Sequence, residues 1–318
     1  MQGSVLSRRQ EAEFITAIQG RGEVPLKFAY LGEGAQNWDR IARERSEGEG
    51  INSAEAALLQ KRVDDFLSTL EPDSGINVID IGCGNGLPVL PILDRLAASK
   101  IAFTYVPLDI SKEMLDLATQ TINSRYPQVE CRPTEMDFEL GQFSDLTYQI
   151  KEKMPVNLLL FLGSTLGNHS DLNRVLSNFR DSMTSKDFLI LGVELTNLAK
   201  VDKLFPHYEN EGVQTLVTYA LNYLKIPQTT FSYKVSWNEK YSQIEMRAVF
   251  NQEVPVEFAD EKFSLSKGEN LLLGRSIKFT EYSVTKLLSD VGFRTELLTT
   301  PPDRGYLLTM IQPTRYSV

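Results

Sequence analysis

The residues best suited to chemistry form a glycine-rich turn after a short apolar run. The run ends at Gly82, and two further glycines follow as Gly84 and Gly86. Glycines after a strand let a cofactor approach the backbone closely, and the helix that follows offers free N–H groups. A dinucleotide site requires GxGxxG, but here the spacing is GxGxG and Leu87 stands where the third glycine would be. The spacing therefore disfavours a dinucleotide.

A carboxylate precedes the turn, because Asp80 lies two positions before Gly82. Its charge would repel a pyrophosphate but would attract the cationic groups of a methionine-type cofactor. GxGxG preceded by an acid is the usual signature of enzymes that bind S-adenosylmethionine (SAM). We therefore expect SAM as the cofactor, and a dinucleotide or a turn that binds no ligand are the alternatives.

Two further acids follow at intervals that suit the same cofactor. Asp109 ends the second strand candidate, where a ribose diol needs a carboxylate acceptor. It lies a little further from Gly82 than the ~20 residues of the dinucleotide pattern. The pair Asp137-Phe138 follows the next crossover and is expected to meet the adenine amino group and ring. For either acid, a helix cap or a solvated surface charge is the alternative.

The elements that must position these residues alternate between strands and helices. Strands are predicted at 77–82, 103–108, 155–163 and 188–195, and helices at 8–19, 87–98, 111–122 and 171–183, with a further helix capped by Ser53. This alternation indicates a parallel sheet with crossover helices. After residue 199 the pattern changes to a helical stretch and antiparallel strands at 230–237, 243–250 and 253–258, followed by a helix at 282–290 and strands at 294–300 and 306–312.

Composition and charge exclude several classes of protein. The 318 residues include 33 Lys and Arg but 42 Asp and Glu, and the formal charge of −9 disfavours a non-specific nucleic-acid binder. Hydrophobic residues at 42% and charged residues at 24% are typical of a globular protein. The only histidines, His169 and His207, lie in no HExxH, Cys/His or GxSxG pattern. We therefore expect neither a metal site nor a Ser-His-Asp triad.

The cysteine content and the hydropathy of the sequence indicate in which cellular compartment the protein works. Cys83 and Cys131 are the only cysteines, so we expect a reduced, cytoplasmic setting without a disulfide framework. The longest apolar run, 158–162, is far shorter than the ~20 residues of a membrane helix, and residues 1–11 lack the apolar region of a signal peptide. The expected partner is a small-molecule amine, with no nucleic acid or membrane, and the expected state is a monomer or homodimer.

In combination, these motifs resemble a class I SAM-dependent methyltransferase. The stretch Phe161-Leu-Gly-Ser-Thr-Leu-Gly-Asn168 narrows the resemblance to the histidine-specific methyltransferase-like family. That family includes the ergothioneine-pathway histidine Nα-methyltransferase and fungal methyltransferases of prenylated tryptophan. Further matching stretches occur, in order, at 27–30, 105–109, 137–138, 208–213, 244–247 and 276–279.

The resemblance implies an α/β fold with a Rossmann-like core and a discontinuous second α+β domain that binds the substrate. We place the methyltransferase core at 60–198 and 280–318, and the substrate domain at 1–59 and 199–279. The change of pattern near residue 199 coincides with one of these boundaries.

The resemblance also implies roles for individual residues. Tyr30 would contact the methionine end of SAM. The remaining cofactor residues would be Asp80, Gly82, Gly84, Gly86, Asp109, Asp137, Phe138 and Gly163. Asn168 and Tyr208 would be catalytic, with Asn168 accepting a hydrogen bond from the substrate amine and Tyr208 holding a carboxylate. The substrate site would also include Gln214, Val217 and Ser276.

These roles are chemically coherent. Methyl transfer depends mostly on positioning, and an amide oxygen can orient a neutral amine without titrating, so a strong general base is unnecessary. For Asn168, a turn-forming Gly-Asn is the alternative. For Tyr208, an ordinary aromatic at the edge of the core is the alternative.

The sequence departs from the family where the substrate binds. The histidine enzyme grips the imidazole with a carboxylate next to a serine, but here Gly274 stands in place of that acid while Ser276 remains. The family's Tyr-Tyr-Pro-Thr is replaced at 49–52, and Gln214 and Val217 replace a threonine and an aromatic residue. Because an unpaired imidazole N–H is costly in such a site, we expect weak or no turnover of histidine.

The expected function is SAM-dependent N-methylation of a small amine, an amino acid or an amino-acid-derived specialised metabolite other than histidine. The alternatives are histidine Nα-methylation, O- or C-methylation, a nicotinamide-dependent reductase and a catalytically inactive SAM-binding partner subunit. The reductase is disfavoured by the glycine spacing.

Overall fold

The computed structural model describes residues 6–46, 51–70, 75–196 and 198–314. The chain divides into two compact units, each formed by two separate stretches of sequence. Unit 1 comprises 1–41 and 197–278, and unit 2 comprises 42–196 and 279–318.

The first boundary between the units differs from the expected one. We expected residues 1–59 to belong with the insertion, but the division falls after Ile41. The reason is α3 (Ile51–Leu70), which packs against α4 (Leu90–Ala98) and β12 (Tyr306–Pro313) within unit 2. The later divisions, after Thr196 and Lys278, lie one or two residues from the expected positions.

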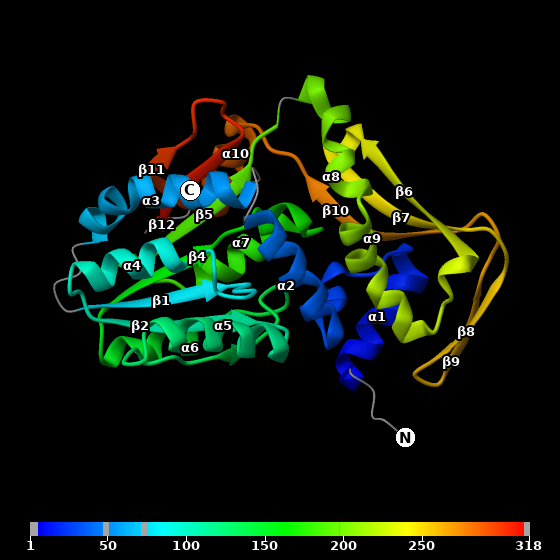
Figure 1. The fold of residues 1–318 in the computed structure, drawn as a ribbon, viewed down its shortest axis with the longest axis horizontal. Coiled ribbons are helices and arrows are strands. Elements are labelled where there is room, and N and C mark those ends of the chain that lie inside the picture. Colours follow the sequence, from blue (N-terminus) through cyan, green and yellow to red (C-terminus); the bar gives the residue numbers. More distant parts are fainter. Residues whose placement is uncertain (1–5, 47–50, 71–74, 197, 315–318) are drawn as a thin grey trace. The chain divides into compact units, whose positions relative to one another are not determined.

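Unit 2 is built on a seven-stranded sheet of order β11-β12-β5-β4-β1-β2-β3 (Figure 1). Its strands are β1 (Ile76–Ile81), β2 (Phe103–Asp109), β3 (Thr134–Glu135), β4 (Val156–Phe161), β5 (Phe188–Glu194), β11 (Phe293–Thr299) and β12. Neighbours among β1 to β5 are parallel, whereas β12 is antiparallel to both β5 and β11. The predicted α/β class, a Rossmann-like sheet wound in both directions from β1, is confirmed.

Helices cover both faces of this sheet. On one face, alternate strand residues such as Val78 and Leu158 share a core with α3, α4 and α5 (Lys112–Arg125). On the other face, the ring of Phe161 on β4 contacts Phe179 of α7 (Leu172–Asp181) at 4.9 Å between centroids. Helix α7 packs in turn against α10 (Glu281–Val291). Burial on both faces explains why the strands read as continuous apolar runs.

Local signals placed some helix ends and missed others. Ser111 caps α5 as predicted, because its hydroxyl accepts a hydrogen bond from the Met114 N–H. Gly292 ends α10 with a φ of 93°, a conformation that glycine adopts without strain. The prediction that Ser53 caps a helix is wrong, because α3 already begins at Ile51. Helix α4 begins at Leu90, three residues later than predicted.

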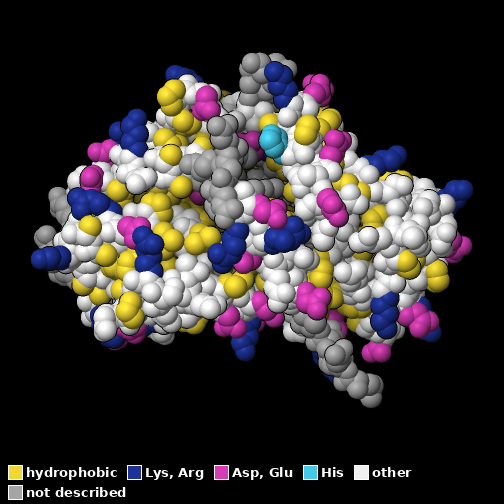
Figure 2. Space-filling view, in the orientation of Figure 1, with side chains coloured by type: hydrophobic (Ala, Val, Ile, Leu, Met, Phe, Trp, Pro, Cys, Tyr) yellow, Lys and Arg dark blue, Asp and Glu magenta, His cyan; other side chains and the backbone are white. Residues whose placement is uncertain are grey.

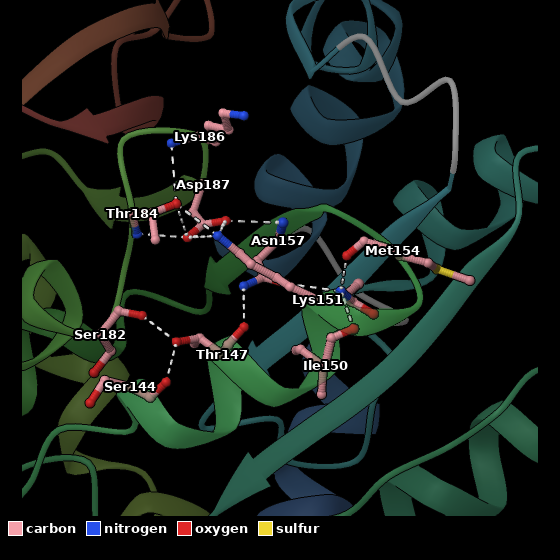
Figure 3. A network of polar contacts seen from close by, with 11 residues as sticks. Ser144, Thr147, Ile150, Lys151, Met154, Asn157, Ser182, Thr184, Lys186 and Asp187 are labelled. Carbon is pink, nitrogen blue, oxygen red and sulfur yellow. Dashed lines mark hydrogen bonds and ion pairs between the residues drawn. The ribbon is translucent and has the colours of Figure 1, made fainter.

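A buried polar network joins the amino ends of the central strands (Figure 3). Asp187, which precedes β5 and is fully buried, forms an ion pair of 2.7 Å with Lys151. It also accepts hydrogen bonds from the N–H groups of Asn157 and Thr184. The amide of Asn77 at the start of β1 donates to the Asn157 side chain at 3.0 Å. This network holds the edge of the sheet opposite to the glycine turn.

Unit 1 contains a three-stranded antiparallel sheet of order β10-β7-β6 and a separate hairpin, β8–β9 (Figure 1). Its strands are β6 (Phe231–Asn238), β7 (Gln243–Phe250), β8 (Val254–Phe258), β9 (Glu261–Leu265) and β10 (Asn270–Ile277). The three strands predicted in this region are present, but the one at 253–258 pairs in the hairpin. Strands β9 and β10 were not predicted.

The remaining helices are short apart from α1 and α2. They are α1 (Arg8–Arg21), α2 (Glu33–Ser46), α6 (Ser144–Gln149), α8 (Pro206–Glu209) and α9 (Glu211–Thr218). The 3-10 helices are η1 (Leu26–Tyr30), η2 (Ile150–Glu152), η3 (Thr165–Asn168), η4 (Leu198–Leu204), η5 (Tyr219–Leu224), η6 (Gln228–Thr230) and η7 (Glu239–Tyr241).

Charged side chains of both signs are interspersed over the face of the molecule that Figure 2 shows. Cys83 is buried and Cys131 half-buried, and both thiols are free. Within the described ranges, no helix is long and apolar enough to cross a membrane. The same ranges hold no group of three or more His, Cys, Asp or Glu side chains arranged to bind a metal.

The polar network predicts a large effect on stability from one substitution. Asp187→Ala removes the acceptor of Lys151 and of two backbone N–H groups. Since breaking a buried pair leaves a charge and donors without partners, we expect the free energy of unfolding to fall by about 3 kcal/mol. Urea denaturation followed by circular dichroism measures this change. Glu152→Ala, an exposed acid beside Lys151, is the control, and equal stability of the two variants would contradict the prediction.

Candidate active site

The glycine turn adopts backbone conformations that favour glycine at three positions. Gly82, Gly84 and Gly86 have φ values of 64°, 53° and 71°. A Cβ atom at Gly86 would lie 3.2 Å from the Cα atom of Ala118 on α5, which is tighter than ordinary packing. The spacing read from the sequence therefore reflects a real constraint on the path of the chain between β1 and α4.

Asp109 at the end of β2 lies against this turn. Its Oδ2 accepts a hydrogen bond from the Gly84 N–H at 3.4 Å, and its Oδ1 accepts one from the Ser111 N–H at 3.0 Å. Burial raises the pKa of the Asp109 carboxyl to about 6, although the backbone hydrogen bonds act in the opposite direction. The parallel register of β1 and β2 thus brings together two features that lie apart in the sequence.

Asp80 is buried below the turn and is oriented by a tyrosine. The hydroxyl of Tyr105 on β2 donates to Asp80 Oδ2 at 2.8 Å. Burial, together with the nearby charges of Asp109 and Glu55, raises the pKa of Asp80 to about 7, although the Tyr105 hydrogen bond acts in the opposite direction. Asp80 therefore belongs to a group of buried acids, and Tyr105 was not identified from the sequence.

Phe138 packs beside the first glycine of the turn. A Cβ atom at Gly82 would lie 3.7 Å from the Phe138 ring. The same ring contacts Phe161 and His169 with centroid distances of 5.5 and 5.4 Å. The neighbouring Asp137 accepts a hydrogen bond from the Glu139 N–H with its Oδ1. Phe138 thus lies beside the glycine turn, and its contact to the cofactor stays a prediction.

The segment from Gly163 to Asn168 turns sharply after β4. Gly163 and Ser164 both have positive φ values, of 73° and 58°, and η3 then ends at the half-buried Asn168. The Gly163 N–H donates to both carboxylate oxygens of Glu55 on α3, at 3.1 and 2.9 Å. Sequence reasoning missed Glu55. The available signal was an acid placed three and four residues before Leu58 and Leu59, on the buried face of its helix.

The predicted substrate residues of unit 1 form a second group. The hydroxyl of Tyr208 on α8 donates to Ser276 Oγ on β10 at 3.0 Å and accepts from Lys278 Nζ at 2.6 Å. Lys278 is buried and its ammonium group also lies over the Tyr208 ring. It belongs to one of the stretches that match the family, but the sequence assigned it no role.

Three other predicted residues also lie in unit 1. Gln214 and the buried Val217 are on α9, and the half-buried Tyr30 ends η1. Tyr30 packs against the small apolar cluster of Ala29 and Leu216. The roles of Tyr30, Gln214 and Val217 at the cofactor and the substrate stay predictions.

The raised pKa of Asp80 predicts how stability depends on pH in the ligand-free protein. Its ordinary value is 3.8 and its value in the folded chain is about 7. Between these values the folded chain keeps a proton that the unfolded chain releases, so this contribution to stability is lost as the pH rises. The Asp80→Asn side chain does not titrate, so the variant does not lose stability in this way. When the pH rises from 5 to 8, the Tm of the variant minus that of the wild type should therefore increase by about 3 °C or more.

Differential scanning fluorimetry at each pH checks this expectation. Asp116→Asn, which removes an exposed acid from α5, is the matched control and should keep a constant difference from the wild type. A pH-independent difference for Asp80→Asn would show that this carboxyl titrates normally.

Comparison with known proteins gives a consistent result. A family model described as "Histidine-specific methyltransferase, SAM-dependent" matches residues 10–313. Histidine N-alpha-methyltransferase of Mycolicibacterium smegmatis is 26% identical over 302 residues, which cover 90% of this chain and 89% of that protein. The 4-dimethylallyltryptophan N-methyltransferase of Penicillium roqueforti is 26% identical over 210 residues, 63% of this chain and 59% of that protein.

Among solved structures, magnesium protoporphyrin IX methyltransferase of Synechocystis with bound S-adenosylhomocysteine has a TM-score of 0.47 and is 14% identical, covering 91% of this chain and 98% of that one. The family model spans nearly the whole chain and includes the glycine turn, the Gly163–Asn168 segment and strand β10. This chain therefore belongs to the SAM-dependent, histidine-specific methyltransferase family.

Proposed function

We propose that this enzyme methylates the amine of a small molecule, an amino acid or amino-acid derivative with an apolar side chain rather than histidine. Its membership of a SAM-dependent methyltransferase family is established by the family match. The identity of the acceptor is the proposal, and it rests on the surroundings of Gly274.

The residues around the glycine turn fit SAM as the methyl donor. Asp80 and Asp109 are buried carboxylates, and a cationic ligand would offset the cost of their burial. When bound, SAM supplies a methyl group attached to a positively charged sulfur. Asp109 would accept hydrogen bonds from the ribose hydroxyls, and Phe138 would contact the adenine ring.

The observation that carries the choice of acceptor is the set of apolar side chains around the buried Gly274 on β10. A Cβ atom at this position would lie 2.9 Å from Met246 Cε, 3.6 Å from Val217 Cγ1 and 3.7 Å from Leu26 Cδ1. The position where the histidine-specific enzyme has its imidazole-binding acid therefore faces apolar atoms. A substrate N–H placed there would lose its hydrogen bond to water at a cost of about 1–3 kcal/mol.

A cluster of polar side chains lies close to Gly274 along the chain. Ser276 lies two residues after Gly274 on β10, so both positions project to the same face of the strand. The hydroxyls of Ser276 and Tyr208 and the buried ammonium of Lys278 follow one another at hydrogen-bond distance. Such a set can hold a carboxylate through charge-assisted hydrogen bonds. An amino acid with an apolar side chain would complement both sets, because its side chain matches the apolar atoms and its carboxylate matches the polar cluster.

Nitrogen is favoured as the acceptor atom over oxygen or carbon. A neutral amine carries its own lone pair and needs orientation, which the amide oxygen of Asn168 can provide, whereas a hydroxyl or carbon acceptor needs a strong base. The two relatives described above are both named as N-methyltransferases, of histidine and of 4-dimethylallyltryptophan. The second name describes an amino acid with a large apolar substituent.

The cofactor assignment predicts a specific loss of binding. Asp109→Ala removes a carboxylate acceptor, so we expect the affinity for S-adenosylhomocysteine to fall about 10- to 100-fold. Isothermal titration calorimetry measures this, with Asp116→Asn as the exposed-acid control on the following helix. Wild-type protein should bind S-adenosylhomocysteine and should give no heat with NADPH. Binding of NADPH alone would overturn the assignment.

The acceptor assignment predicts the outcome of a substrate panel. Amino acids, their decarboxylated amines and diamines are incubated with enzyme and SAM, and methylated products are identified by mass spectrometry. We expect the highest kcat/KM for an amino acid with an apolar side chain, and a value for histidine at least about 10-fold lower, because its imidazole N–H would lack a partner. A histidine value equal to the best in the panel would disprove the proposal.

Gly274→Glu tests the structural basis of this preference. Its carboxylate would face the flexible end of Met246, so we expect the ratio of histidine to best-acceptor kcat/KM to rise about 10-fold or more. Gly274→Ala is the matched control, since it adds bulk at the same point without charge. An equal change of the ratio in both variants would show that space and not charge determines the preference.

A further inference from the structure

Glu55 is a charged residue in a place where charge is costly. It lies on α3 with 2% of its surface exposed, on the same helix face as Leu58 and Leu59. Long charged side chains are almost never fully buried unless they are paired. The donors recorded for its carboxylate, the Gly163 N–H and the Tyr306 hydroxyl, are both neutral.

The contacts of this carboxylate converge from three separate elements at one edge of the sheet. Gly163 follows β4, Tyr306 begins β12, and Gly192 belongs to β5. A Cβ atom at Gly192 would come closer than 3.0 Å to both Glu55 Oε2 and the Tyr306 hydroxyl. A side chain at 192 would therefore displace the Glu55–Tyr306 pair, so strand β5 leaves the space that the pair occupies.

The segment that Glu55 contacts is the one that carries Asn168. Gly163 and Ser164 are consecutive residues with positive φ, and for serine this conformation is unfavourable. Strained backbone persists only where surrounding contacts determine it. Thr165 supports the turn from within, because its hydroxyl donates to the Leu162 carbonyl at 2.8 Å. Glu55 supports it from outside the segment, through the Gly163 N–H.

We propose that Glu55 is a positioning residue for methyl transfer, which fixes the backbone at Gly163 and thereby the placement of Asn168. A carboxylate suits this task because its two oxygens accept from Gly163 and Tyr306 together. Tyr306 in turn fixes the direction of the carboxylate. An apolar residue at position 55 would stabilise the core but would leave the Gly163 N–H without its acceptor.

The energetic cost of Glu55 supports a positional over a purely structural role. Burial raises the pKa of its carboxyl to about 7, although both hydrogen bonds lower it. The charge of Asp80 lies near enough to interact with it. Taking a carboxylate out of water costs free energy, and neutral donors offset this cost only in part. A residue that is retained only for stability would thus be better served by a neutral side chain.

The test compares Glu55→Ala, Glu55→Gln and Tyr306→Phe in the full chain. Hydrogen–deuterium exchange of the peptide spanning 162–169 reports on the segment directly and requires no acceptor. We expect faster exchange there in Glu55→Ala, with exchange of α5 unchanged. Glu55→Gln should restore part of the protection, because its amide oxygen can still accept from the Gly163 N–H. Tyr306→Phe should lie between Glu55→Ala and the wild type.

The kinetic arm rests on the proposed amine acceptor and uses the best substrate of the panel. In Glu55→Ala we expect kcat to fall about 100-fold, while the affinity for S-adenosylhomocysteine changes by less than about 3-fold, since a small displacement of a positioned group mainly affects the chemical step. Glu55→Gln should recover at least about 10-fold of this loss. The controls are Asp65→Asn, whose side chain on α3 is 48% exposed, and Tyr148→Phe, which changes an exposed tyrosine of α6.

Two results would overturn the proposal. One is unchanged exchange of 162–169 in Glu55→Ala. The other is a Glu55→Ala enzyme that loses thermal stability but keeps a kcat equal to that of Asp65→Asn, which would show a structural role alone. If no amine in the panel is methylated, the proposed function fails, and the exchange experiment still decides the role of Glu55.

Discussion

Three carboxylates buried along one edge of a parallel sheet are the constraint on which unit 2 depends. Asp80 lies one residue before the end of β1, Asp109 ends β2, and Glu55 reaches the same edge from α3. Each has a pKa raised by burial, so each costs free energy in the ligand-free chain. The surrounding structure supplies hydrogen-bond donors to all three, from the turn at Gly84, from Tyr105 and from Gly163.

This arrangement explains the contrast between the two edges of the sheet. At the amino edge, Asp187 is paired with Lys151 and accepts hydrogen bonds from within the chain, so a cationic partner for this carboxylate is already present. At the carboxyl edge, the acids are held by neutral donors. A cationic cofactor would complete their electrostatic balance, which is the reason that this edge suits binding.

Unit 1 combines a cluster of apolar side chains around Gly274 with a small polar group. Met246, Val217 and Leu26 surround the place of a missing side chain at Gly274, and Lys278, Tyr208 and Ser276 form a chain of hydrogen bonds. The family to which the chain belongs fixes the reaction class. The choice of acceptor is a proposal, and it rests on the apolar atoms around Gly274.

Much of unit 2 could be read from local patterns. The strands β1, β2, β4 and β5 are continuous apolar runs, and Ser111 and Gly292 carry their own helix-end signals. Unit 1 was harder. Strand β10 was missed because its sequence alternates poorly and its register shifts by a bulge between Leu272 and Gly274. Residues 253–258 read as a strand, but their pairing in a hairpin depends on β9.

Some features of the candidate site could likewise be predicted from the sequence, whereas others appear only in the tertiary structure. The sequence by itself determined the glycine turn and its preceding acid, because their residue types and spacing suit a tight turn and favour a cationic cofactor. The stretch from Phe161 to Asn168 was identified by its resemblance to the family. The tertiary structure alone decided the contacts of Tyr105, Glu55 and Lys278, since each forms a hydrogen bond with a partner distant in the sequence. The boundary between the units was also tertiary, because α3 joins unit 2 through packing on β12. Local sequence specifies conformation and chemistry, whereas long-range contacts determine which buried groups meet.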